Sequence, residues 1–175
     1  IVKKDKTDNY VPPAWMPDML LKIAKSAGFF LFGDGVSIDV VTVIPHKPGK
    51  ARRLELLLDE MRRIASAADI DIEFRTDLLF FDEKASKSLR GYTAQERRFE
   101  QENHLHGCNI DLSSKRVLVI DDVITTGSTI GRAIHLLENM HEQKKYASFS
   151  IEKEAYFIKM SVYRMNDYRA RRLFP

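Results

Sequence analysis

A chain of 175 residues is long enough for one domain with a sizeable core and too short for two comfortable ones. Its hydrophobic content of 44% and charged content of 30% are ordinary for a globular protein, and no stretch approaches the roughly 20 consecutive apolar residues of a membrane-spanning helix. A net charge of +3 is low for a dedicated nucleic-acid binder. Cys108 is the single cysteine, so an intrachain disulfide is excluded and we expect a reducing, cytoplasmic compartment.

The amino-terminal part of the chain predicts an arm, a helix and a short strand. Residues 1–17 are polar and then rich in proline, which indicates an irregular arm. Asp18 is a candidate N-cap for a short helix that stops at Gly28. Residues 29–32 are a candidate short strand before a glycine-containing turn. No secretory signal pattern is visible, and a chain that starts without Met is expected to be a fragment or a processed product.

The next segment predicts a strand, a helix and a second strand. Residues 39–44 have the apolar content of a buried strand. Pro48-Gly49 is expected to open a strong helix, because the apolar residues from Leu54 to Ala68 follow helical spacing. A second strand is expected within residues 70–74 or within residues 78–81.

Residues 82–111 are polar and charged, with no sustained apolar period. Segments of this kind that exceed about 15 residues in a compact domain are usually functional lids or disordered. Thr93 and Glu96 form a capping-box pattern, which predicts a helix over residues 94–103. Near the end of the chain, residues 151–165 alternate enough to predict a last strand or a hairpin. Strands that alternate with helices imply a parallel sheet covered by helices, with the ligand at the carboxyl ends of the strands.

The strongest signal is the run RVLVIDDVITTGSTIG at residues 116–131. A buried strand ends on Asp121 and Asp122, and a turn rich in Thr, Gly and Ser leads into an amphipathic helix. The carboxylates can accept hydrogen bonds from vicinal hydroxyls, and the N–H groups of the turn and helix N-terminus can hold a phosphate. A sugar phosphate offers both groups. Neither a Walker A loop nor a dinucleotide fingerprint is present, and the plain alternative is a strand-turn-helix with a Ser or Thr N-cap.

This run resembles the phosphoribosyl-pyrophosphate motif of type I phosphoribosyltransferases, which has several apolar residues, two acids, two more apolar residues, and then Thr-Thr-Gly-x-Thr. Every position of that pattern is met from Val117 to Thr129. The resemblance implies that Asp121 and Asp122 bind the ribose 2′- and 3′-hydroxyls. It also implies that the 5′-phosphate is surrounded by the turn residues Thr125, Thr126, Gly127, Ser128 and Thr129.

The fold implied by the resemblance is α/β, with a parallel-sheet core, helices on both faces and a small variable hood. We expect a single domain over residues 1–175, with the core at about 36–145 and the hood built from 1–35 and 146–175. In the family, the hood selects the nucleobase, and no motif in these two segments indicates which base that is.

The loop after the first buried strand is basic and opens at the same sheet edge as Asp121. In the family, the corresponding loop holds pyrophosphate, and the resemblance carries this role onto His46, Lys47 and Lys50, with Arg52 and Arg53 as further candidates. Charge-assisted hydrogen bonds from cations to phosphate oxygens suit a leaving group with several negative charges. The alternative is a solvated basic turn.

Residues 84–98 stand where the family keeps its mobile catalytic lid. Leu89, Glu96 and Arg97 give this segment a similarity to the competence-protein-F branch, although the four-cysteine zinc module of that branch is missing and the lid is longer. The resemblance implies that Lys87 and Arg97, and Arg90 as an alternative, close over the site and exclude water.

Three residues of metal-binding types alternate just after the lid: His104, His106 and Cys108. On a strand they would face one side, but they lack a fourth ligand and the spacing of structural zinc sites. We therefore favour a polar strand edge and expect no metal held by direct protein ligation. Magnesium is expected as a cofactor bound mainly through phosphoribosyl pyrophosphate.

The resemblance implies a phosphoribosyltransferase that exchanges pyrophosphate for a nitrogenous base at ribose C1. Three alternatives remain open: a regulator that binds a phosphoribosyl ligand without turnover, a nucleic-acid-associated module, and a nucleotide-degrading effector. The expected partners are phosphoribosyl pyrophosphate and a nucleobase or other nitrogen acceptor. Nucleic acid is the less favoured partner, and no membrane partner is expected. The sequence does not indicate which acceptor is used, whether the chain turns over its ligand, or whether it forms a homodimer.

Overall fold

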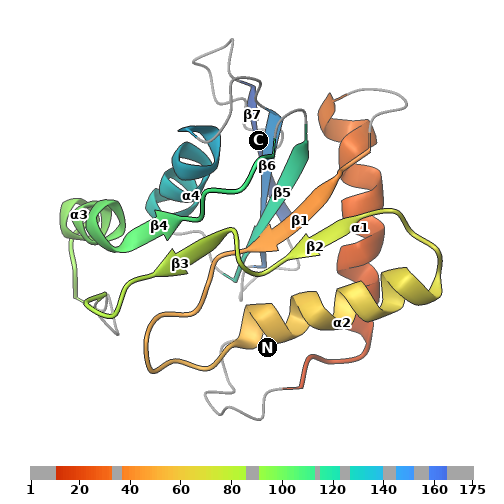
Figure 1. Cartoon of the computed structure of the whole chain (residues 1–175), viewed down its shortest axis with the longest axis horizontal. Coiled ribbons are helices and arrows are strands. Elements are labelled where there is room, and N and C mark those ends of the chain that lie inside the picture. The colour runs from red at the N-terminus through yellow and green to blue at the C-terminus, as the bar shows by residue number, and fades with distance from the viewer. Residues whose placement is uncertain are drawn as a thin grey trace.

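The computed structural model describes residues 11–32, 37–85, 91–112, 115–122, 127–139, 145–151 and 158–164, and for 27–32, 138–139 and the last two strands it describes the backbone alone. A five-stranded sheet in the order β2-β1-β5-β6-β7 forms the centre of this part of the chain (Figure 1). Its strands are β1 (Val40–Val43), β2 (Glu73–Arg75), β5 (Arg116–Asp121), β6 (Lys145–Ile151) and β7 (Ile158–Arg164). All neighbours pair in parallel except β6 and β7, which are antiparallel.

Helices cover both faces of the sheet, as the fold class predicts (Figure 1). Alternate residues of β1 and β5 belong to the two different core clusters on the opposite faces of the sheet. Val41 and Leu118 belong to a core cluster with α1 (Trp15–Phe32) and α2 (Arg53–Ala67). Val40 and Val117 belong to a second cluster with α4 (Ser128–Asn139). A strand that is buried on both faces reads as a continuous apolar run, which is the pattern of β1 and β5 in the sequence.

A second, two-stranded antiparallel sheet lies beside α4. It consists of β3 (Leu79–Phe81) and β4 (Leu105–Gly107), and α3 (Ala94–His104) leads directly into β4. Leu78, Leu79 and Leu105 join the core cluster on the α4 side of the main sheet. The small sheet therefore anchors the segment predicted as a lid to the body of the domain.

The neighbouring strands β1 and β5 form a topological switch point. The chain leaves β1 through α2 on one face and reaches β2, whereas it leaves β5 through α4 on the other face and reaches β6 on the opposite side. The connections therefore diverge at the carboxyl ends of these two strands, where ligands bind in open α/β sheets. Val43 is in register with Ile120, and the Ile44 N–H donates to the Ile120 carbonyl at 2.9 Å.

Several predicted elements are confirmed. The strand at 39–44, the motif strand and the motif helix correspond to β1, β5 and α4. Both positions considered for the second strand form strands, β2 and β3, but in different sheets. The capping box begins α3 as expected: Thr93 Oγ1 accepts from the Glu96 N–H at 3.2 Å, and the Thr93 N–H donates to Glu96 Oε2 at 2.7 Å.

The predicted boundaries of α1 are wrong. The helix starts at Trp15, so Asp18 lies in its first turn, where its carboxylate pairs with Lys22 at 2.7 Å. Pro17 is tolerated there because the first N–H groups of a helix have no acceptor within the helix. The helix also continues through Gly28 to Phe32, so the strand predicted at 29–32 does not form. An interior glycine costs a helix only about 1 kcal/mol, which packing of α1 against α2 can outweigh.

The start of α2 is also later than expected. Pro48-Gly49 belongs to a turn, in which Gly49 has a φ of 70° and the Lys50 N–H donates to the Lys47 carbonyl at 3.0 Å. The helix then begins at Arg53. A left-handed residue cannot belong to a right-handed helix, so the whole basic loop stays non-helical.

The carboxyl-terminal hairpin begins earlier than the sequence indicates. A hairpin was expected within residues 151–165, whereas its first strand, β6, starts at Lys145 and pairs in parallel with β5. The described residues of the segment that we assign to the hood on that side, 146–151 and 158–164, thus continue the main sheet. The single domain and the core and hood limits stay predictions. Among the described helices, none combines the length and apolarity that crossing a bilayer requires.

Asp39 and Arg116 fasten the amino-terminal ends of β1 and β5 together. Arg116 donates from Nε and its backbone N–H to Asp39 Oδ2 and from Nη2 to Asp39 Oδ1, each at 2.7 Å. Both side chains are about three-quarters buried. The hydrogen bonds from Arg116, partly opposed by burial, hold the pKa of Asp39 below its ordinary value.

Replacing Asp39 by Asn should lower the free energy of unfolding by about 1–2 kcal/mol at neutral pH, because a bidentate charge-assisted pair is lost. Since the folded pKa of Asp39 is depressed, this stabilisation is present above the unfolded pKa of about 3.9 and is lost as the pH falls through the folded value. Urea unfolding at about pH 7 and about pH 3 measures the difference, which should shrink on acidification.

The matched control is Asp59→Asn, whose carboxylate makes a half-exposed pair with Arg62 on α2. This change should alter the free energy of unfolding by about 0.5 kcal/mol or less. A deficit in Asp39→Asn that is the same at both pH values would contradict the assignment.

Candidate active site at the carboxyl ends of β1 and β5

The two motif acids differ in accessibility. Asp121 is the last residue of β5 and is 7% exposed, and its Oδ1 accepts the Asp122 N–H at 2.7 Å. The side chain of Asp122 is 24% exposed. Asp121 thus holds the backbone N–H of Asp122, whereas Asp122 is the more accessible carboxylate of the pair.

Arg53 joins the basic loop to the acidic pair. It is the first residue of α2, and its Nη2 lies 3.6 Å from Asp122 Oδ2. At this distance the contact is an ion pair rather than a short hydrogen bond. Lys50 and Arg52, from the same loop, are exposed. The structure therefore brings the two segments to one sheet edge, as the sequence predicts.

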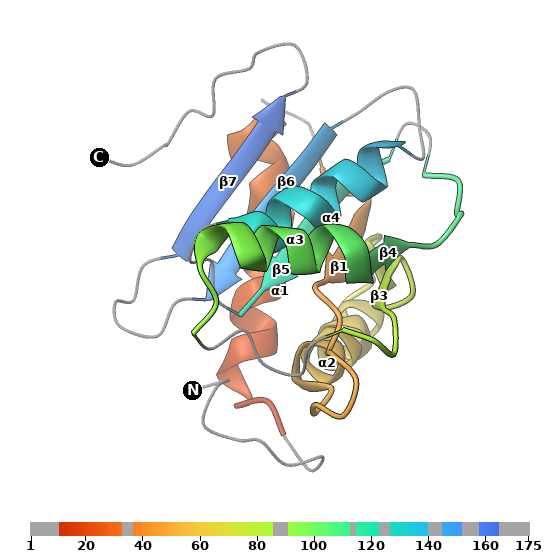
Figure 2. The ribbon, with the colours of Figure 1, turned by 90° about the vertical axis from the view of Figure 1, so that its left-hand side faces the viewer.

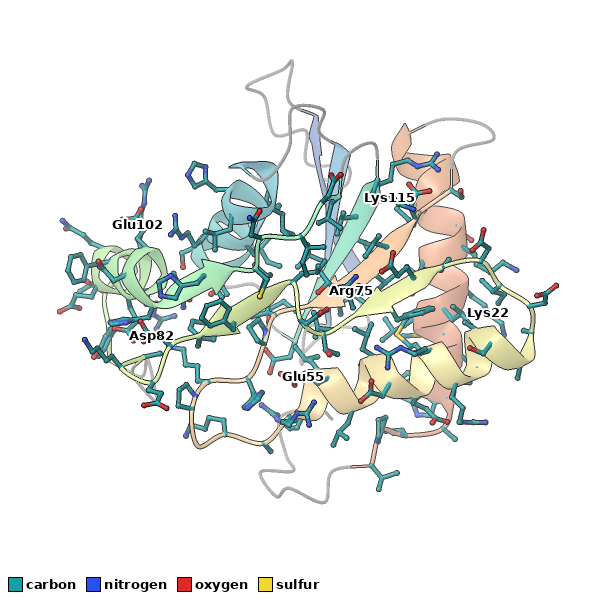
Figure 3. All side chains as sticks on the ribbon, viewed as in Figure 1. Lys22, Glu55, Arg75, Asp82, Glu102 and Lys115 are labelled. Carbon is teal, nitrogen blue, oxygen red and sulfur yellow. The ribbon has the colours of Figure 1, made fainter. Side chains whose placement is uncertain are left out.

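His46 is held by an acid in the first turn of α2. Glu55, which is 3% exposed, accepts hydrogen bonds at its Oε1 from the His46 backbone N–H and from His46 Nδ1, both at 2.7 Å. Glu55 lies close to the carboxyl end of β1 (Figure 3). A carboxylate in the first turn of a helix is also favoured by the helix dipole. Because Nδ1 donates to Glu55, the opposite ring nitrogen of His46 is the one available to a ligand.

Lys47 makes contacts with two elements outside its loop. Its Nζ lies 3.8 Å from Glu100 Oε1 on α3 and 5.1 Å from the ring centroid of Phe81 on β3. The lysine side chain is 15% exposed. Burial lowers the pKa of Lys47, and the charge of Glu100 opposes part of that shift. The ammonium group therefore stands at the edge of the loop with a carboxylate as its counter-ion.

The contacts continue from Glu100 into the small sheet. His104 Nε2 lies 3.9 Å from Glu100 Oε2, and His104 Nδ1 lies 3.0 Å from Asp82 Oδ1. His106 Nε2 approaches Asp82 Oδ2 at 3.2 Å. Hydrogen bonds, first from His104 and then from His106, lower the pKa of Asp82 to about 2. Asp82 thus joins the end of α3 to β4, and it lies at the end of the molecule where α3 is found (Figure 3).

The expected alternation of His104, His106 and Cys108 on one strand is wrong. His104 is the last residue of α3, and only His106 lies within β4. The two histidines share Asp82, whereas the half-buried Cys108 donates its backbone N–H to the Leu78 carbonyl at 2.9 Å. Within the described part of the chain, no group of three or more His, Cys, Asp or Glu side chains is arranged so that it could hold a metal ion.

The phosphate turn is described from Gly127 onward. Gly127 has a φ of 76°, in the left-handed region that glycine adopts at low cost. Ser128 is the first residue of α4, and the Gly131 N–H donates to the Gly127 carbonyl at 2.8 Å. Thr129 is half-buried. Thr125 and Thr126 lie outside the described residues, as does Lys87 of the predicted lid.

An open groove of about 800 Å³ begins at this turn and lies between α3 and α4. The two helices lie side by side (Figure 2). Residues that line the groove are Ala94, Arg98, Glu102, Gly127, Ser128, Gly131, Arg132 and His135. Arg97 donates instead from Nε to the Tyr92 carbonyl at 3.0 Å, so Arg98 is the lid arginine that reaches the groove. The catalytic role of Arg97 stays a prediction.

Four polar residues of this region escaped the sequence reasoning: Glu55, Glu100, Arg98 and Arg132. Glu55 was hidden in a strongly helical segment, although an acid in the first turn of α2 is a signal that could have been used. Glu100 looks like one more solvated charge in the helix AQERRFEQENH, yet it is 7% exposed. Only the packing of α3 distinguishes its buried side from its solvent side.

The comparisons with known proteins identify the family of the chain. Residues 55–155, more than half of the chain, match the family described as the phosphoribosyl transferase domain, and the chain therefore belongs to that family. The chain is 40% identical over 47 residues to a ribose-phosphate pyrophosphokinase of Thermococcus kodakarensis, an alignment that covers 27% of this chain and 17% of that protein. The similarity to the competence-protein-F branch stays a prediction.

One solved structure, described as an allosteric regulatory enzyme of purine biosynthesis, aligns with 78% of this chain and 25% of its own chain. The sequence identity is 16% and the TM-score is 0.42. A similarity at this level adds nothing to the family assignment. The chain spans a quarter or less of the length of these two relatives.

Replacing Glu100 by Gln should lower the pKa of Lys47 further. The carboxylate at 3.8 Å raises this pKa against the larger effect of burial, so its removal leaves burial unopposed. A pH titration of the lysine side chains by NMR measures the change. Glu102→Gln, on the same helix but paired with Arg98, is the control and should leave Lys47 unchanged. An unchanged pKa in Glu100→Gln would contradict the pairing.

Proposed function

We propose that this chain binds phosphoribosyl pyrophosphate at the carboxyl ends of β1 and β5 and transfers its phosphoribosyl group to a nitrogen acceptor. The observation that carries the proposal is the Arg53–Asp122 ion pair at 3.6 Å. It joins a cationic loop to an acidic pair at the switch point of a chain that belongs to the phosphoribosyl transferase domain family. A ligand with an anionic group at one end and vicinal hydroxyls in the middle fits this arrangement of charges.

Three groups of residues would divide the ligand among them. Asp122, with Asp121 behind it, accepts hydrogen bonds from the ribose hydroxyls. The turn at residues 125–129 and the first N–H groups of α4 hold the 5′-phosphate. His46 and Lys47 bind the pyrophosphate, which then competes with Glu100 for the Lys47 ammonium. Lys50 and Arg52 are exposed and lie in the same loop.

Magnesium is the cofactor that we propose, bound mainly through the pyrophosphate. The oxygen-rich carboxylates of Asp121 and Asp122 suit this cation, which prefers oxygen ligands and keeps several waters. When bound, the cation neutralises charge on the leaving group. Arg53 already pairs with Asp122, so direct ligation of magnesium by Asp122 would require this pair to open.

In the reaction, a nitrogen of the acceptor forms a bond to C1 while the bond from C1 to the pyrophosphate oxygen breaks, and the electron pair leaves with pyrophosphate. Positive charge develops on the ribose ring, and the carboxylates at the end of β5 stabilise it. The segment that contains α3 keeps water away from C1, because attack by water would hydrolyse the substrate. The nucleobase remains to be identified.

A binding protein without turnover is the second candidate. The side chain of Lys47, which would bind the leaving group, is only 15% exposed and already has a carboxylate counter-ion. The archaeal relative is named for a ribose-phosphate pyrophosphokinase rather than for a transferase to a base. A pyrophosphokinase of this kind and a transferase to a base share a ribose-phosphate ligand but carry out different reactions. A regulator would keep the ligand site and release no pyrophosphate.

Replacing Asp122 by Ala should weaken phosphoribosyl pyrophosphate about 10- to 100-fold, because charge-assisted hydrogen bonds worth about 1.5–3 kcal/mol are removed. Thr126→Ala should also weaken binding. Calorimetry with magnesium present measures both effects, and Asp59→Ala, in a half-exposed pair on α2, is the control. If the Asp122 and Thr126 variants bind as the parent does, the ligand is not held by this motif.

Replacing Lys47 by Ala should weaken phosphoribosyl pyrophosphate much more than a nucleoside 5′-monophosphate, since the monophosphate lacks the leaving group that Lys47 would bind. Lys115→Ala, at the amino-terminal end of β5 and far from Glu55 (Figure 3), is the matched control. Equal weakening of both ligands, together with DNA affinity that falls steeply with salt, would instead indicate nucleic-acid binding.

Pyrophosphate release distinguishes the enzyme from the binding protein. The chain is mixed with magnesium and phosphoribosyl pyrophosphate, and nucleobases are added one at a time. Release with one base identifies the acceptor. Tight binding of phosphoribosyl pyrophosphate without release from any base supports the regulator and overturns transfer.

A further inference from the structure

The groove between α3 and α4 extends well beyond the phosphate turn. On α4 it is lined by Ser128, Arg132 and His135, which follow one another at helical spacing along one face. On α3 it is lined by Ala94, Arg98 and Glu102, spaced in the same way. At a rise of 1.5 Å per residue, the stretch from Ser128 to His135 covers about 10 Å. A ligand held only by its terminal 5′-phosphate would leave most of this length empty.

The walls of the groove are cationic. Arg132 donates from Nη2 to the Glu102 carbonyl at 3.1 Å, and Arg98 donates from Nε to Glu102 Oε1 at 2.9 Å. These contacts place two guanidinium groups on opposite helices, and the side chain of Arg98 is 76% exposed. Each guanidinium has five N–H donors, so several remain for a ligand. Two arginines against one glutamate, next to the positive end of the α4 dipole, favour an anion.

The hydrogen bonding of Arg132 is incomplete within the described part of the chain. Its Nε is buried, and within the described ranges no acceptor lies within hydrogen-bond distance of it. A buried donor without an acceptor is unfavourable, because it has lost its hydrogen bonds to water. A small movement of the side chain towards an anion in the groove would allow this N–H to find an acceptor.

Gly131 keeps the floor of the groove open. It lies inside α4, where glycine is less favourable than alanine. Nothing lies within 4 Å of the position that a Cβ would take, so no close packing requires glycine here. A larger side chain at this position would project into the groove without a clash against the described protein atoms.

We propose that nucleoside 5′-diphosphates occupy this site in competition with phosphoribosyl pyrophosphate. The α-phosphate lies on the turn at Gly127 and Ser128, and the β-phosphate lies in the groove between Arg98 and Arg132. This inference rests on the proposed function, which puts a 5′-phosphate at that turn. The second phosphate of the nucleotide thus extends away from the ribose, on the side opposite to the pyrophosphate at C1.

Calorimetry with the 5′-monophosphate and the 5′-diphosphate of adenosine, and likewise of guanosine, tests the inference in one buffer. For the base that binds, the diphosphate should bind about 10-fold or more tightly, since charge-assisted hydrogen bonds to a second phosphate are added. Phosphoribosyl pyrophosphate should displace it. Equal affinity of mono- and diphosphate would overturn this inference and leave the proposed function standing. No binding of phosphoribosyl pyrophosphate itself would overturn the proposed function.

Two variants assign the effect to the groove. Arg132→Gln should abolish the preference for the diphosphate. Gly131→Leu should do the same by filling the groove, with monophosphate affinity within about twofold of the parent because the turn is untouched. Gly131→Ala should keep the preference, and Arg63→Gln, paired on the exposed side of α2, is the remote control.

Circular dichroism confirms that each variant is folded. Gly131→Leu keeps the test decisive if Arg132→Gln does not fold, because its Cβ has open space. A diphosphate preference that persists in Gly131→Leu would overturn the groove as its cause.

Discussion

The parallel pairing of β1 with β5 is the constraint on which the site depends. Four residues of each strand are in register, from Val40 with Val117 to Val43 with Ile120, and every residue of the two strands is buried apart from Arg116. The pairing puts the end of β1 beside Asp121, so the basic loop and the motif turn begin at adjacent points. At the other end of the same pair, Asp39 and Arg116 resist slippage. A shift by one residue would turn Val41 and Leu118 towards the wrong face.

The cations and acids of the site are already paired with one another. Arg53 has Asp122, Lys47 has Glu100, and the His46 ring has Glu55. Buried or half-buried charges need such partners, because desolvation of a lone ion is costly. A phosphorylated ligand can therefore bind by exchange, with its phosphate oxygens replacing a carboxylate beside Lys47. The pair that the proposed ligand would open, Lys47 with Glu100, has a long distance of 3.8 Å.

The helix α3 contacts the basic loop, the small sheet and the groove along α4. Glu100 contacts the basic loop, His104 leads to Asp82 and the small sheet, and Arg98 and Glu102 line the groove along α4. Movement of α3 would thus alter the counter-ion of Lys47 and the width of the groove together. If nucleoside diphosphates hold α3 against α4, they act on the same helix that the transfer reaction would use to exclude water.

The sequence by itself determined the family, the motif strand, its helix and the capping box of α3, because each depends on residues close together in the chain. A buried strand that ends on two acids and leads into a Thr-Thr-Gly-Ser-Thr turn is a specific sequence motif. Thr93 and Glu96 make their hydrogen bonds within one turn of the helix. Local patterns predicted the element boundaries less well where tertiary packing sets them. The helix α1 continues through Gly28, and β6 begins at Lys145 despite its mixed composition. Only the tertiary structure gave Glu100 and Glu55 their partners Lys47 and His46 and put Arg98 across from Arg132. Those contacts join residues that are far apart in sequence or lie on helices with several charged positions, and sheet order and helix packing alone select which of these charges face one another.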